Sequence, residues 1–231
     1  MFTHDPATHH HTDAGQSLAM WWLNTDHTTP TASGLATRLT RQLVLTYTSR
    51  DDTVVSLTGD LHATAATLLA GRNFIAVNAP GDLANIDPNT PPTLITAQWP
   101  PARHQPDEAL LADLLLACTL ISGSGPATIA VITPVAESDA AAYRHPQLTG
   151  IPGLHHRLDV IALSRPAEPE RFLFPLTLPE AAALVAAHGI RSDTPAARIR
   201  VFSVAGRAAD SPLARRPANS HHHAGAKTVD R

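Results

Sequence analysis

The stretch YTSRDDTVVSLTGDLHATAATLLAGRNFIAVN, residues 47–78, decides the fold class of this 231-residue chain. A short β-branched run at residues 53–57 is typical of a buried strand. The Ala- and Leu-rich segment 61–70 predicts a helix, and Gly71 stands where a helix-ending glycine belongs. A second apolar run at residues 73–77 predicts another buried strand. The order strand, helix, strand is that of a parallel pair with a helical crossover.

The same alternation continues on both sides of this stretch. Further helices are expected at residues 35–46, 107–120 and 179–188, with a poorly formed helix at 146–157, and further strands at 93–98, 127–133, 158–163 and 198–204. The pattern predicts one α/β domain at about residues 18–206, a doubly wound and mostly parallel sheet covered on both faces. The last strand is amphipathic, and we expect it at an edge of the sheet.

Both ends of the chain are polar and lack periodicity, so we predict disordered tails at residues 1–17 and 207–231. Each tail carries a triple histidine, at residues 9–11 and 221–223. Three adjacent imidazoles on a flexible segment do not make a preorganised metal site, so no bound metal is predicted.

The sequence points to a cytoplasmic protein. No apolar run is long enough to span a membrane, and the N-terminal segment lacks the basic and apolar regions of a signal peptide. Cys118 is the only cysteine, which excludes a disulfide within the chain, and its apolar helix indicates a core position.

Charge is distributed unevenly. Residues 191–231 carry eight basic and three acidic side chains, although the whole chain has a formal net charge of −3. An acidic body with a basic tail is common in proteins that associate with nucleic acid. We therefore predict DNA as a partner, bound through the basic tail 207–231. The alternative is a solvated terminus without a partner, and nothing in the pattern indicates the oligomeric state.

Residues 47–78 resemble the cofactor half of S-adenosylmethionine-dependent DNA methyltransferases of the exocyclic-amino (adenine or cytosine) type. The shared frame is the run from Asp52 to Val55, a turn with Gly59, the Ala/Leu helix, and the run from Gly71 to Ile75. Residues 94–102, LITAQWPPA, then stand where that family has a strand ending in a Pro-Pro motif. The resemblance implies a Rossmann-like methyltransferase fold over about residues 19–204, with S-adenosylmethionine as the cofactor.

The resemblance implies a cofactor site at the carboxyl ends of the first two strands of the motif, where ligands bind in open α/β sheets. Its residues are Ser56, Thr58, Gly59, Asp60 and Asn78. The motif is degenerate, because Ser56 replaces an acidic residue and the turn has a single glycine. Asn78 stands where the family has a carboxylate for the ribose hydroxyls. Alternatively, Asn78 is an Asx-turn residue.

The implied catalytic motif is also altered. It comprises Gln98, Trp99, Pro100 and Pro101. Aligned on the prolines, Trp99 occupies the position of the family's polar residue, yet an indole donates a hydrogen bond and cannot accept one. Gln98 could replace that acceptor only with a backbone shift. Trp99 either stacks on a flipped base or, as we prefer, fills the vacated pocket as a buried aromatic.

We therefore predict an S-adenosylmethionine-dependent DNA methyltransferase-like protein that is catalytically degenerate. The first alternative is an active, divergent DNA amino methyltransferase. The second is an unrelated nucleotide-binding α/β module or a protein-interaction domain. All three are compatible with the fold, which does not by itself give the activity.

Overall fold

The computed structural model describes residues 18–25, 32–57, 61–78, 82, 85–87, 89–99, 108–123, 125–135, 151–165, 168–188 and 194–205. The two tails lie outside these residues. The strands are β1 (Leu18–Leu23), β2 (Thr53–Ser56), β3 (Asn73–Ala76), β4 (Leu94–Gln98), β5 (Ala127–Val135), β6 (Leu154–Ser164), β7 (Arg171–Leu176) and β8 (Ala196–Val204). The helices are α1 (Ala32–Tyr47), α2 (Leu61–Leu69), α3 (Glu108–Ile121) and α4 (Leu178–Ala187).

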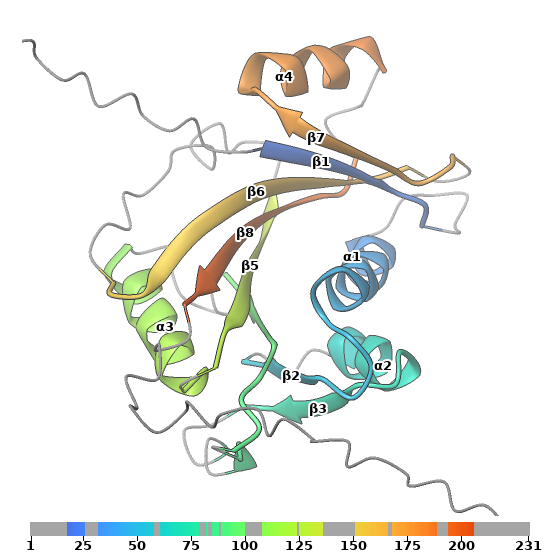
Figure 1. Cartoon of the computed structure of the whole chain (residues 1–231). Helices are drawn as coiled ribbons and strands as arrows, with labels where there is room; N and C mark the ends of the chain where they lie inside the picture. Colours follow the sequence, from blue (N-terminus) through green and yellow to red (C-terminus); the bar gives the residue numbers. More distant parts are fainter. Residues whose placement is uncertain are drawn as a thin grey trace, which may run out of the picture.

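All eight strands form one sheet in the order β3-β2-β4-β5-β8-β6-β1-β7 (Figure 1). The neighbours from β3 to β5 are parallel, and so are β6 and β1. Only β8, between β5 and β6, and β7, beside β1, run antiparallel to their neighbours. Six strands therefore share one direction, and the prediction of a mostly parallel α/β sheet is confirmed.

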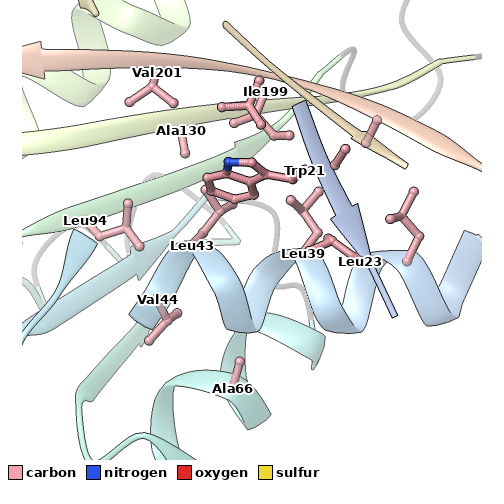
Figure 2. Close-up of a cluster of buried hydrophobic side chains, with 14 of the residues drawn as sticks. Trp21, Leu23, Leu39, Leu43, Val44, Ala66, Leu94, Ala130, Ile199 and Val201 are labelled. Carbon is pink, nitrogen blue, oxygen red and sulfur yellow. The ribbon is translucent and has the colours of Figure 1, made fainter. Parts of the chain in front are cut away.

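Helices cover both faces of the sheet. Helices α1 and α2 lie on one side and α3 on the other (Figure 1). Because side chains alternate along a strand, Trp21 of β1 packs with Leu39 and Leu43 of α1 (Figure 2), whereas the next residue, Trp22, packs on the opposite face with Ala181 of α4. The doubly wound arrangement is thus confirmed, with α1 and α2 on one face and α3 and α4 on the other.

The expectation that the last strand lies at an edge is wrong. Strand β8 lies between β5 and β6 and is paired along its length with both. Its amphipathic pattern comes from Arg198 and Arg200, which alternate with Ile199 and Val201, yet both arginines are buried. Charged residues usually indicate a solvated face, but here they lie inside the molecule.

A buried ion pair explains how Arg198 of β8 is accommodated. Nη2 of Arg198 donates to Oδ2 of Asp159 in β6 at 2.7 Å, and both side chains are only 4% exposed. Nε2 of His156 lies 3.2 Å from the other oxygen of Asp159. The imidazole also meets the ring of Phe202 edge-on, with centroids 5.2 Å apart. Two strands distant in sequence are thus joined by charge as well as by backbone pairing.

Two further differences between the predicted and observed elements concern segments whose apolar residues follow neither a helical nor a strand period. The poorly formed helix expected at residues 146–157 is wrong over its described part, because Leu154 to Arg157 begin β6 after a turn in which Gly153 has a φ of 77°. The pattern also does not predict β1 or β7. Strand β1, LAMWWL, is buried on both faces and so shows no alternation, and β7 contains Pro175, which argues against a strand except at an edge.

Gly71 ends α2 as the sequence predicts, with a φ of 70° and its N–H donating to the Leu68 carbonyl at 3.0 Å. We expect Gly71→Ala to lower the free energy of unfolding by about 1 kcal/mol, because a Cβ strains left-handed backbone. The added Cβ would meet only Cγ of Arg50, at 3.9 Å, so backbone strain would be the cause. Urea unfolding measures this. Gly71→Asn, which tolerates this conformation better, should cost less, and equal losses would contradict the explanation.

Candidate functional site

The carboxyl ends of β2, β3 and β4 meet at one edge of the sheet. Ser56, the last residue of β2, is paired with Ala76 of β3 and Thr96 of β4. Just beyond, the Val77 N–H donates to the Ser56 carbonyl at 2.8 Å, and the Leu57 N–H donates to the Thr96 carbonyl at 3.0 Å. Ser56, Asn78 and Gln98 thus come from three adjacent strands to one edge, as their positions after parallel strands predict.

Ser56 is a buried polar residue at this edge. Its side chain is on the α1/α2 face, because Val54, two residues earlier, packs with α1 and Val55 packs with α3. Ser56 is fully buried, and its Oγ has no hydrogen-bond partner among the described residues. A buried hydroxyl without a partner costs free energy, so this oxygen is suited to receive a polar group from a ligand or from the turn that follows.

The end of β3 carries a carboxylate that the sequence analysis missed. Asn78 is exposed, and its backbone N–H donates to Oδ2 of Asp82 at 2.8 Å. An acidic side chain four residues later in the sequence thus lies beside the backbone of the uncharged Asn78. The signal available in the sequence was the Gly-Asp pair at residues 81–82, since an aspartate in a turn commonly accepts from nearby backbone.

The two described residues of the Pro-Pro motif face opposite sides of the sheet. Trp99 is 4% exposed and packs in the cluster of α3, with Leu111 and Leu115. Its backbone N–H donates to the Ile132 carbonyl at 2.7 Å, which fixes the end of β4 against β5. Gln98 is exposed. The environment of Trp99 is that of a buried aromatic, and Gln98 is the accessible polar side chain of the two.

The remaining candidates, Thr58, Gly59, Asp60, Pro100 and Pro101, lie outside the described residues. Within the described ranges, no group of three or more His, Cys, Asp or Glu side chains could hold a metal ion. In that same part of the chain, no helix has the length and apolar character needed to cross a membrane.

Cys118 has a structural environment rather than a reactive one. It is fully buried in the α3 cluster, as the sequence predicts. Burial raises the pKa of its thiol to about 12, so the sulfur is protonated at neutral pH and is not a nucleophile.

Comparison with known proteins gives a loose structural likeness. No family model matches the chain, and no curated protein sequence does either. Among solved structures, the chain is similar to a release factor-specific protein-(glutamine-N5) methyltransferase from Alicyclobacillus acidocaldarius subsp. acidocaldarius. The two are 14% identical, the match covers 72% of this chain and 91% of the other, and the TM-score is 0.37. The resemblance to exocyclic-amino DNA enzymes stays a prediction.

Proposed function

We propose that this chain binds S-adenosylmethionine weakly at the carboxyl edge of β2, β3 and β4, and that it is catalytically degenerate. The observation that carries the proposal is the Asp82 carboxylate, held 2.8 Å from the Asn78 N–H at the end of β3. Ribose hydroxyls are hydrogen-bond donors, and carboxylate and amide oxygens accept from them. Asp82 and Asn78 would hold the ribose, and Ser56 lies at the end of the neighbouring strand.

Catalytic degeneracy is supported by the residue at the position of the family's polar acceptor, which is Trp99. The bound cofactor would provide an electrophilic methyl group, but an exocyclic amino nitrogen is a poor nucleophile because its lone pair is delocalised into the ring. An acceptor must therefore polarise the amino group, and the indole of Trp99 cannot accept a hydrogen bond. Gln98 carries the accessible carbonyl oxygen at the end of β4.

DNA as the target rests on the sequence resemblance and on the basic residues 207–231, which lie outside the described residues. We expect no methyl incorporation into mixed-sequence DNA from radiolabelled cofactor. Incorporation that disappears in Gln98→Leu would instead support the active alternative, with Gln98 as the acceptor.

Cofactor binding is tested by calorimetry with S-adenosylmethionine. We expect Asp82→Asn to weaken binding by about 5-fold, because a hydrogen bond to a charged acceptor is stronger than one to a neutral acceptor by about 1 kcal/mol. The asparagine oxygen can still accept from the Asn78 N–H, so the turn is retained. The matched control is Asp113→Asn on the exposed side of α3, which should leave binding unchanged.

Two results would count against the proposal. The first is an absence of binding heat at millimolar cofactor. The second is equal binding of the cofactor by the wild type and Asp82→Asn, which would show that the Asp82 carboxylate does not contact the ribose. In either case the unrelated nucleotide-binding or interaction module becomes the better explanation.

A further inference from the structure

A small polar pocket opens on the outer side of α1. It has a volume of about 110 Å³ and is lined by Arg38, Arg41, Gln42, Leu45 and Glu170. The four α1 residues are three, four and seven positions apart, which places them on one stripe of the helix. Two guanidinium groups line the pocket, and guanidinium groups bind phosphate oxygens in a bidentate manner. The Gln42 side-chain amide beside them donates to Oγ1 of Thr46 at 3.1 Å.

Two exposed aromatic rings lie on strand β7, which begins directly after Glu170 of this pocket. Strand β7 is an outer strand (Figure 1), and its Phe172 and Phe174 are 47% and 61% exposed. Phe172 is paired with Trp21, which packs with α1, so its ring is on the α1 side. Phe174 lies where the register of β7 with β1 shifts, between the pairs Met20–Leu173 and Leu18–Leu176. The ring of Phe172 meets Trp21 edge-on, with centroids 5.8 Å apart.

The pocket and the rings are close together along the chain. Glu170, which lines the pocket, is two residues before Phe172. At about 3.3 Å per residue of extended chain, their Cα atoms are roughly 7 Å apart. We call the surface made by the pocket, Phe172 and Phe174 the α1–β7 face.

We propose that the α1–β7 face binds single-stranded nucleic acid, with a backbone phosphate in the pocket and bases stacked on Phe172 and Phe174. Arginines beside exposed aromatic rings are the combination that such strands require, because guanidinium groups contact phosphates and every base has a π-face. A duplex keeps its bases stacked inside and cannot offer them to the rings. This site does not depend on the proposed cofactor site.

Replacing Glu170 should change the affinity in the opposite direction to replacing an arginine of the pocket. Its carboxylate lines the pocket and repels a phosphate there. We expect Glu170→Gln to tighten binding, whereas Arg41→Ala should weaken it. Because each phosphate contact on a single strand contributes about −0.7 to the slope of log affinity against log salt, Arg41→Ala should flatten that slope by about 0.7.

The experiment uses the full chain, without cofactor, and labelled oligothymidylate of about 15 nucleotides followed by fluorescence anisotropy at several salt concentrations. Phe174→Ala is the main variant, since the ring is the more exposed of the two. We expect it to weaken binding by about 5- to 150-fold, the range for loss of one stacked base. Oligouridylate, a duplex of the same length and inorganic phosphate are the comparison probes.

The control variants make similar changes away from the α1–β7 face, on α3 at the other side of the sheet. Leu120→Ala removes another exposed apolar side chain, 74% exposed on α3, and Asp113→Asn removes an acidic charge on the same helix. Neither should change affinity by more than about twofold. Thermal unfolding of each variant shows whether the fold is retained. Phe172 is not the main target, because its ring also packs against the buried Trp21.

Several results would overturn the proposal: equal affinity of Phe174→Ala and wild type, tighter binding of duplex than of single strand, or complete loss of binding when residues 207–231 are deleted.

Sedimentation velocity tests a second copy of the chain as the occupant. A dimer that Phe174→Ala dissociates, without any effect on oligonucleotide binding, would assign the face to self-association. Loss of cofactor binding alone would leave the proposal standing.

Discussion

Replacing Asp159 by alanine is expected to lower the free energy of unfolding by about 3–5 kcal/mol. The change leaves Arg198 buried, at 4% exposure, without the carboxylate that accepts from it at 2.7 Å. A buried charge that loses its carboxylate has shed its water on folding without that compensation, and this cost dominates the loss. Urea unfolding followed by circular dichroism measures the difference.

Removing both charges is the matched comparison. The double variant Asp159→Leu with Arg198→Met should be much more stable than Asp159→Ala, because replacing a buried pair by apolar residues is often neutral or stabilising. Glu168→Ala, which removes the partner of Arg165 at the surface, should cost less than about 1 kcal/mol. A double variant as unstable as the single one would show that charge is not the cause.

The same pair predicts a dependence of stability on pH. Burial raises the pKa of Asp159, but the hydrogen bond with His156 and the charge and hydrogen bond of Arg198 together outweigh burial, so the pKa is lowered. A lowered folded-state pKa contributes stability above the unfolded-state pKa, and that contribution is lost as pH falls through the folded-state value. The wild type should therefore lose more stability on acidification than the double variant.

Trp99→Ala is expected to destabilise the protein by about 3–5 kcal/mol, the cost of removing a large buried aromatic side chain. The indole packs with Leu111 and Leu115 of α3, and its loss would leave a cavity between the helix and the sheet. Trp99→Phe keeps a ring and should cost clearly less. Gln98→Ala, at an exposed position one residue earlier, should stay within about 0.5 kcal/mol of the wild type.

The variants at this position also separate packing from ligand binding. If Trp99 only packs, Trp99→Phe keeps the affinity for S-adenosylmethionine. A stable Trp99→Phe protein that no longer binds a base or the cofactor would instead favour a stacking role at the end of β4.

The part of the fold that is local in sequence could be predicted. Residues 53–77 show a β-branched run, an Ala-rich helix and a second apolar run, and each element forms there as β2, α2 and β3. The position of β8 could not be predicted, because it depends on Arg198 meeting a carboxylate 39 residues earlier. An amphipathic strand looks the same whether its charged side meets water or a buried partner.

Some residues of the candidate site could likewise be placed from the sequence, and others could not. Residues at the carboxyl ends of parallel strands, such as Ser56 and Gln98, lie at one edge because strand direction alone places them there. Asp82 was not expected there, because its position depends on a hydrogen bond from the Asn78 N–H, which strand direction does not predict. The burial of Trp99 was only one of two alternatives, since a Trp-Pro-Pro sequence does not show which side of the strand α3 covers.

The central position of β8 has a consequence for how the chain folds during synthesis. The strands β3, β2, β4 and β5 form one half of the sheet, and β6, β1 and β7 form the other, and in the described residues only β8 is paired with both halves. Residues 196–204 leave the ribosome after every other described strand. Until then, β5 and β6 each expose an unpaired strand edge, and such edges are prone to aggregation. Closure of the sheet is therefore a late event in the life of the nascent chain.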